Sequence, residues 1–320
     1  MSTTTVVKTA ARSGTPAGGG AGPRKPRGLT DNLRAYLLNT PAMVVIGVLV
    51  AYPIGYSFWL SLHKYNLKLP ALQKFVWFRN YVNLVTDPEF LTSLRVTIAF
   101  VVVVLGLTVL LGTTLALVLN ETFLGRGVLR SLVLLPWAMP GVVNGLMWRT
   151  IFDAKTGPLN GLLYQLGVID SYQAWLTSPT GAFLITALAQ VWNTLPFTVI
   201  ILLAGLSTIP GELYDAAKVD RAGVFQRFGQ VTLPWLLHPL LIVLILETMN
   251  AFRAFDTIYV LTGGGPGDAT NVIAVLNVKT VLTYTDFGLG SAYSWVITLV
   301  TLLVSIGYVS SLYKKGSIEV

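Results

Sequence analysis

The sequence contains a run of 24 residues without a single charge, VTIAFVVVVLGLTVLLGTTLALVL, at positions 96–119. An α-helix needs about 20 apolar residues to cross the hydrocarbon core of a bilayer. A soluble fold would have to bury this run on all sides, and the composition argues against that. The chain is 53% hydrophobic and only 11% charged, against about 25% charged in ordinary soluble domains. The run therefore predicts a transmembrane helix in an integral membrane protein.

Five further segments satisfy the same criterion, which predicts an all-α membrane protein with six transmembrane helices. The spans are expected at Leu37–Leu62, Leu94–Leu119, Leu129–Phe152, Ala182–Leu206, Thr232–Phe252 and Tyr293–Tyr313. The third span contains Pro136 and Pro140, and the fifth contains Pro234 and Pro239. Because proline cannot donate a backbone hydrogen bond, we expect kinks in these two helices.

An even number of spans puts both termini on the same side of the membrane. If that side is the cytoplasm, thirteen of the 22 lysines and arginines lie there, in the tails and the short loops at 120–130 and 208–230. This distribution follows the positive-inside rule and predicts cytoplasmic N- and C-termini. Residues 1–35 are rich in Gly, Pro, Ala and Ser and are expected to form a disordered cytoplasmic tail. Residues 36–315 are then the membrane domain, and 316–320 a C-terminal tail.

Several classes of function are disfavoured by what the sequence lacks. It has no cysteine and two histidines, which leaves little material for a metal site. It also contains no Walker motif, no H-E-x-x-H and no G-x-S-x-G. We therefore expect no catalytic residue, no bound metal or cofactor, and no ATPase site of its own. The net charge of +8 is expected to anchor the chain to membrane lipid rather than to bind nucleic acid.

A charged helix interrupts the apolar sequence between the fourth and fifth spans. In ELYDAAKVDRAGVFQRFGQVTLP, residues Leu213, Ala216, Ala217 and Asp220 follow the spacing of one helical face. That face is mostly small, so a partner can approach it closely. A helix lying on the bilayer surface would instead combine bulky apolar residues with a basic face. The pattern therefore favours docking onto a cytoplasmic partner.

A second short helix is expected to follow within the same loop, at Val224–Gln230. Its aromatic residues Phe225 and Phe228 are expected to pack back onto the membrane domain. At the other side of the membrane, LTGGGPGDAT (261–270) reads as a sharp turn. Contact with a partner is the alternative interpretation of this turn.

The loop at 208–230 resembles the EAA loop of bacterial ABC importer permeases, whose pattern is E-A-A-x-x-D-G-A followed by I-x-L-P. Asp215, Ala216, Ala217 and Asp220 stand at the Glu, Ala, Ala and Asp positions. Arg221 replaces the usual glycine, so Gly223 is expected to supply the tight turn. The segments LLPWAMPGVVNGLMWRTIFD, FDTIYVLTGGGP and FGLGS resemble the maltose-type branch of sugar permeases. The resemblance covers roughly residues 35–315.

This resemblance implies a subunit of the bacterial cytoplasmic membrane that works by alternating access. Its implied partners are a second, related permease, two ATPase subunits that bind ATP and Mg, and an extracytoplasmic sugar-binding protein. The EAA helix of such permeases rests in a groove of an ATPase subunit. By this resemblance the coupling residues are Glu212, Asp215, Ala216, Ala217, Asp220, Arg221 and Gly223.

In maltose-type permeases the sugar lies near mid-membrane, between the helices that precede and follow the EAA loop. The candidate contacts here are Gln190, Asn193, Thr194 and Phe197 before the loop, and Glu247, Asn250 and Arg253 after it. Amides and hydroxyls bond sugar hydroxyls, and an aromatic ring covers a C–H face. Three of these residues have alternative interpretations. Gln190 and Asn193 suit helix–helix hydrogen bonds. Glu247 suits a structural ion pair with Arg253 or with the partner permease, or proton transfer.

The Ala/Gly/Pro-rich tail resembles those of actinobacterial homologues and favours a disaccharide such as trehalose or maltose. Arg149 and Arg253 leave a glycerol-phosphate or other polyol importer as an alternative within the class. An ion-coupled secondary transporter is the alternative outside it. Such a transporter would show inverted repeats and several intramembrane carboxylates, whereas Glu247 is the one carboxylate well inside a predicted span. An intramembrane enzyme has little support.

Overall fold

The computed structural model describes residues 29–313. The predicted N-terminal tail lies outside the described residues up to residue 28, and so does the C-terminal tail from residue 314. Residues 29–35, which the sequence assigns to the tail, are already helical. The chain divides into two parts, one ending at Ile54 and the other starting at Gly55.

The first part is helical throughout its described residues. It comprises α1 (Leu29–Ile46), the π-helical turn η1 (Gly47–Ala51) and the beginning of α2 (Tyr52–Ser61). Large apolar side chains along it are exposed, among them Leu38 and Met43. Such exposure is expected of a helix whose solvent is lipid, because there the backbone is satisfied internally and apolar side chains need no cover.

The second part begins with a small hairpin and then continues as helices. Strands β1 (His63–Lys64) and β2 (Lys74–Phe75) pair antiparallel, with the 3₁₀ turn η2 (Pro70–Leu72) between them. The helical elements that follow are α3 (Arg79–Thr86), α4 (Pro88–Asn120), α5 (Arg126–Leu134), η3 (Leu135–Ala138), α6 (Gly141–Ile151), α7 (Pro158–Gln165), η4 (Trp175–Thr177), α8 (Pro179–Leu206), α9 (Gly211–Val219), α10 (Val224–Arg227), η5 (Phe228–Thr232), α11 (Leu233–Phe252), α12 (Asp256–Thr262), α13 (Ile273–Val278), η6 (Lys279–Thr283) and α14 (Phe287–Tyr313).

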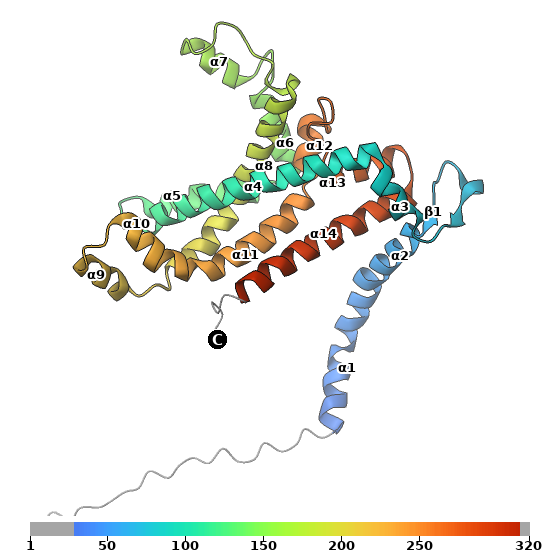
Figure 1. Cartoon of the computed structure of the whole chain (residues 1–320), viewed down its shortest axis with the longest axis horizontal. Coiled ribbons are helices and arrows are strands. Elements are labelled where there is room, and N and C mark those ends of the chain that lie inside the picture. The colour runs from blue at the N-terminus through green and yellow to red at the C-terminus, as the bar shows by residue number, and fades with distance from the viewer. Residues whose placement is uncertain (1–28, 314–320) are drawn as a thin grey trace, which may run out of the picture. The chain divides into compact units, whose positions relative to one another are not determined.

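Helices α4, α8, α11 and α14 form the centre of this part (Figure 1). One apolar cluster joins α4, α8, α11, α12, α13 and α14 around buried Phe100, Ile258 and Tyr293. A second joins the far ends of α4, α8 and α11 around Leu202 and Leu236. Two packed apolar clusters therefore join these helices, while many large apolar side chains on their outer faces remain exposed.

Local sequence signals explain where the long helices begin. The Asp87 side chain accepts a hydrogen bond from the backbone N–H of Glu89 (3.0 Å), and Ser178 accepts one from Gly181 (2.9 Å). In both cases a proline occupies the first helical position, where its missing N–H costs nothing. Asp87 and Ser178 therefore cap the N-termini of α4 and α8.

Among the described residues, five helices are long and apolar enough to cross a membrane, and a bent pair gives a sixth span. The five are Tyr36–Ser61, Pro88–Asn120, Pro179–Leu206, Val224–Phe252 and Phe287–Ser310. The predicted fold is thus confirmed, with one difference in the third span. There, residues Arg126–Ala138 and Gly141–Ile151 meet at 101°. Pro140 stands at the break, as the sequence predicts, whereas the fifth span continues through Pro239 unbroken.

Specific hydrogen bonds hold the bent span in place. Arg126 and Arg130 of α5 donate to backbone carbonyls at the end of α4, including that of Leu119 at 2.8 Å. Beyond the bend, buried Asn144 of α6 donates to the carbonyl of Ala189 (3.0 Å) and to the hydroxyl of Thr257 (3.2 Å). Both arms of the bend are therefore tied to the central helices.

Candidate functional site

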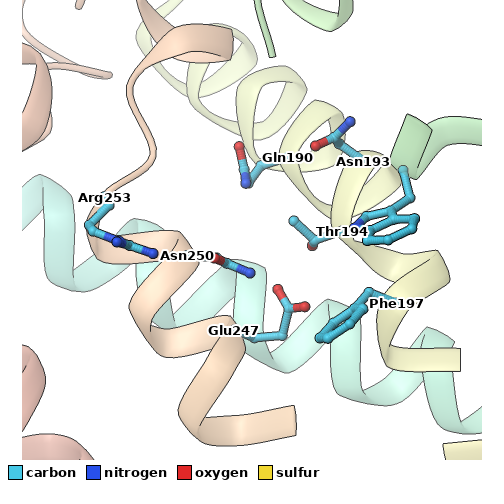
Figure 2. A pocket seen from close by; sticks show the side chains of 8 residues that line it. Gln190, Asn193, Thr194, Phe197, Glu247, Asn250 and Arg253 are labelled. Atoms are coloured by element: carbon cyan, nitrogen blue, oxygen red, sulfur yellow. The ribbon is translucent and has the colours of Figure 1, made fainter. Parts of the chain in front are cut away.

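A cavity of about 450 Å³ lies between α8 and α11. It is lined by all seven residues that the sequence proposes as sugar contacts, together with Trp137 of η3. Figure 2 shows Gln190, Asn193, Thr194 and Phe197 on one helix, facing Glu247, Asn250 and Arg253 on the other. The structure thus brings the predicted residues together at one place. Their role in binding stays a prediction.

Glu247 is the most unusual residue of this cavity. Its side chain is 1% exposed. One carboxylate oxygen accepts a long hydrogen bond of 3.4 Å from the hydroxyl of Thr198, and the other has no hydrogen-bond partner among the described residues. Burying an unsatisfied polar atom is costly unless a ligand or partner pairs with it. The carboxylate is therefore available to accept hydrogen bonds from a molecule in the cavity.

The predicted alternative of an ion pair between Glu247 and Arg253 is not found in the described structure, where the one ion pair joins Lys218 to Asp215. Arg253 instead donates to the carbonyl of Met249 at 3.3 Å, at the end of α11. Its remaining donors are free to reach into the cavity, since a guanidinium carries five N–H groups.

Asn193 is committed to the protein itself. Its amide nitrogen donates to the carbonyl of Pro136 (2.8 Å) and to that of Met139 (3.2 Å). One of these carbonyls lies in η3 just before the break in the third span, and the other lies at the break itself, where helical hydrogen bonding is interrupted. The amide of Asn193 therefore fastens the break to α8, and both of its N–H donors are used there.

Trp137 lies between those two carbonyls in sequence. Its ring stacks on Phe197 of α8, with centroids 5.9 Å apart and planes at 19°. Its side chain is still 57% exposed, so it offers a flat apolar face to the cavity. Sequence reasoning missed this residue because counting helical positions along α8 and α11 does not reach a third segment. The signal was an aromatic residue between two prolines of a predicted span.

Arg149 does not belong to this cavity. It lines a separate one, with Lys279 and Tyr259. Arg253 is therefore the one cation among the residues that line the cavity between α8 and α11, and it shares that cavity with the Glu247 carboxylate.

The charged loop forms α9 as expected, with Glu212 in its first turn and Asp215 bonded to Lys218 at 2.9 Å. Ala216 is exposed and Ala217 half-buried. The helix ends at Val219, and Asp220 occupies the C-cap position. The small face is therefore accessible, as docking on a partner requires.

The turn after α9 differs from the sequence-based expectation. Arg221 itself adopts the left-handed backbone conformation, with φ of 56°. Gly223 has an ordinary φ of −69° and begins α10, where its N–H donates to the Gln226 side chain (3.1 Å). The prediction that Gly223 supplies the turn is therefore wrong. At this position a glycine would adopt the left-handed backbone conformation at a lower free-energy cost than arginine does.

The second helix of the loop also differs. α10 spans Val224–Arg227 and runs through η5 into α11 without a gap. Phe225 is 92% exposed, so the predicted packing of this ring onto the membrane domain is wrong. Phe228, which is half-buried, faces inward beside Tyr214. The Tyr214 hydroxyl is hydrogen-bonded to that of Thr232 at 3.0 Å, which ties α9 to the start of the fifth span.

These features define a multi-span membrane protein with a polar cavity between two spans and an exposed helix in the loop that joins them. A family model described as "Binding-protein-dependent transport system inner membrane component" matches residues 108–313. The chain belongs to this family, and this membership does not favour an ion-coupled secondary transporter.

The chain is 43% identical over 268 residues to the trehalose/maltose transport system permease protein MalF of Thermococcus litoralis, covering 84% of this chain and 89% of the relative. It is 38% identical to the trehalose transport system permease protein SugA of Mycobacterium tuberculosis, with coverage of 84% and 85%. A crystal structure of a bacterial alginate ABC transporter has the same fold. Its TM-score is 0.78 at 20% identity, covering 92% of this chain and 100% of the other.

Proposed function

We propose that the chain is a permease subunit of an ATP-driven ABC importer, and that it carries a sugar through the cytoplasmic membrane by alternating access. The observation that carries the proposal is the cavity between α8 and α11, in a chain of this family. The cavity combines an aromatic pair with amide, hydroxyl and carboxylate groups. Its volume of about 450 Å³ falls in the range of small-molecule sites, roughly 300–1,000 Å³.

The roles of the lining residues follow from their chemistry. Trp137 and Phe197 cover the apolar face of a sugar ring. On the opposite wall Glu247 and Asn250 bond its hydroxyls, with Arg253 at the end of the helix. Gln190 and Thr194 bond further hydroxyls from α8. Asn193, whose donors are used at the break, holds Trp137 in place instead of contacting the sugar.

We propose a neutral disaccharide such as trehalose or maltose as the substrate. The relatives whose names specify trehalose or maltose support this choice. A phosphorylated polyol fits less well, because the Glu247 carboxylate would repel its phosphate and Arg253 is the one lining cation. Arg149, which the sequence left as a second cation for such a substrate, lines another cavity.

The chain would act with a second permease, two ATPase subunits that bind ATP and Mg, and an extracytoplasmic sugar-binding protein. It would itself have no ATPase site. In this assembly α9 docks on an ATPase subunit from the cytoplasm, which requires cytoplasmic N- and C-termini. The exposed small face at Ala216 and the exposed ring of Phe225 support this docking.

Reconstitution tests the function directly. The transporter, assembled with its ATPase subunits in proteoliposomes, should accumulate labelled trehalose or maltose when binding protein and ATP are supplied. Glu247→Ala and Asn250→Ala should each raise the KM for the sugar. Sugar uptake that is unchanged in both variants would mean that the binding cavity lies elsewhere. Failure of the chain to co-purify with any ATPase subunit would refute the proposed class.

The orientation has its own test. Because the chain contains no cysteine, a single cysteine introduced at Ala216 or at Lys64 is the one thiol available for labelling. A membrane-impermeant thiol reagent applied to intact cells should label the Lys64 position and spare Ala216. The reverse pattern would place α9 outside the cell, where no ATPase could reach it.

A further inference from the structure

A second cavity, of about 590 Å³, lies at the end of the bundle away from α9. It is formed by α6, α12 and the turn around η6. Helix α11 separates it from the charged loop: α11 starts at Leu233, directly after the loop, and its other end leads into α12. Twenty helical residues span about 30 Å. If α9 faces the cytoplasm, this cavity faces the extracytoplasmic side.

Two cations line this cavity, and neither is neutralised. Arg149 donates to the carbonyl of Val260 at 3.4 Å, and Lys279 donates to the side-chain oxygen of Asn271 at 3.3 Å. Both partners are uncharged and both bonds are long. In the described part of the chain, no carboxylate lies within ion-pair distance of either cation. The unused donors of the two side chains therefore remain available for an anionic group.

Hydrogen bonds and close packing hold the walls of the cavity. The turn LTGGGPGDAT, for which the sequence left a partner-contact role open, is held by buried Thr270. Its hydroxyl is hydrogen-bonded to that of Thr262 (2.6 Å) and to the carbonyl of Gly265 (2.9 Å). Gly264, at φ of 92°, leaves room for the Lys279 ammonium. On the other wall, Gly145 of α6 packs directly against the backbone of α12.

Aromatic residues complete the lining. Tyr259 is 43% exposed and Tyr284 is 54% exposed, and both line the cavity. Tyrosine and arginine are the residue types that most often dominate protein–protein binding energy. Pre-ordered cations also accelerate the encounter with an acidic surface. These observations point to a protein partner with a carboxylate at its tip rather than to a free ion.

We propose that this basic cavity, defined by Arg149, Lys279, Tyr259 and Tyr284, is the docking site for an acidic loop of the soluble binding protein. The inference rests on the proposed function, which supplies that partner and its side of the membrane. A carboxylate of the loop bridges Arg149 and Lys279, and the two tyrosine rings pack against the adjoining chain. The contact guides the loaded binding protein onto the outer face of the permease.

The experiment measures ATPase activity of the reconstituted transporter against the concentration of its binding protein, at two ionic strengths. The double variant Arg149→Glu, Lys279→Glu should raise the half-saturating concentration about 10-fold or more, because opposite charges that steer association become like charges. The maximal rate at saturating binding protein should be retained. The milder pair Arg149→Gln, Lys279→Gln should give a smaller increase in the half-saturating concentration and weaken its salt dependence. This pair replaces the Glu double variant if that variant assembles poorly.

The matched control reverses the same number of charges elsewhere. Lys64 and Lys74 are exposed cross-strand partners on the β1–β2 hairpin, and changing both to Glu should alter the half-saturating concentration less than about 2-fold. Equal effects of the two pairs would overturn the proposed site. So would a defect that follows the content of anionic lipid in the vesicles instead of the concentration of binding protein. A wild-type transporter that binding protein never stimulates would refute the proposed function itself.

Discussion

Substitution of Asn193 by alanine tests whether the bent span positions the aromatic wall of the cavity. The change removes two hydrogen bonds, to the carbonyls of Pro136 and Met139. At about 0.5–1.5 kcal/mol each, they contribute about 1–3 kcal/mol together. Part of this is retained, because the Pro136 carbonyl still accepts the backbone N–H of Met139 at 3.1 Å. We therefore expect the KM for the sugar to rise about 3- to 10-fold, with 1.4 kcal/mol corresponding to tenfold.

The assay is a double-mutant cycle on sugar uptake by the reconstituted transporter. If Asn193 acts through Trp137, then Asn193→Ala should add nothing to the KM once Trp137 is already alanine. Fully multiplicative effects of the two changes would show that Asn193 contacts the sugar independently, and would refute this reasoning.

A matched control is available in Asn80, whose amide also donates to two backbone carbonyls, those of Ser61 (2.7 Å) and His63 (2.9 Å). Asn80→Ala removes the same number and type of hydrogen bonds at a site that does not line the cavity. It should lower the thermal midpoint of the transporter and leave the KM unchanged.

Three further substitutions, two of them paired with a control substitution, test the coupling loop and the packing of the spans. Arg221→Gly should stabilise the loop by about 1 kcal/mol, because glycine adopts a left-handed backbone without strain, and a thermal unfolding midpoint that falls would contradict this. Gly205→Ala should destabilise the transporter by about 1–3 kcal/mol, since the added methyl group overlaps a proline ring of α11. Gly106→Ala in α4, where the added methyl group meets open space, should not lower the stability in the same unfolding measurement. Tyr214→Phe removes the hydrogen bond between α9 and Thr232 of η5 and should raise the ATP consumed per sugar transported, whereas Tyr308→Phe, which loses a similar tyrosine–threonine bond to Thr248, should leave this ratio unchanged.

The spans could be predicted from sequence because their signal is local. A run of about 20 apolar residues forms a transmembrane helix in a bilayer, because a helix satisfies its own backbone hydrogen bonds there. The placement of charges then predicts the orientation. The seven cavity residues came together because helical periodicity places Gln190 and Phe197 on one face of α8. That face meets α11 only through the fold of the whole domain, and it was the resemblance to a known family that selected the two helices.

Periodicity failed where the chain departs from a straight helix. The third span turns by 101° between Ala138 and Gly141, and no count of helical positions reveals which way Trp137 then faces. For Asn193 the sequence left both a sugar contact and a helix–helix hydrogen bond open, and its acceptors, the carbonyls of Pro136 and Met139, become known only once the path of the bent span is known. At Arg221 the sequence indicated an unusual residue, but the tight turn was expected at the nearest glycine. Glycine adopts turn conformations most easily, and this preference of a single residue type is a weaker guide than the packing around a turn.

The loop that contains α9 is tightly connected to the spans on both sides of it. Only four residues separate the end of α8 at Leu206 from the start of α9 at Gly211, and Ile209 within that link is buried in the apolar cluster shared by α4, α8 and α11. On its other side, α9 is bonded through Tyr214 to Thr232. A force applied to α9 must therefore act on the ends of α8 and α11 together, because the link is too short and too well packed to absorb it. These two helices carry the opposite walls of the cavity, Phe197 on one and Glu247 on the other, so we expect a displacement of the loop to be transmitted to those walls.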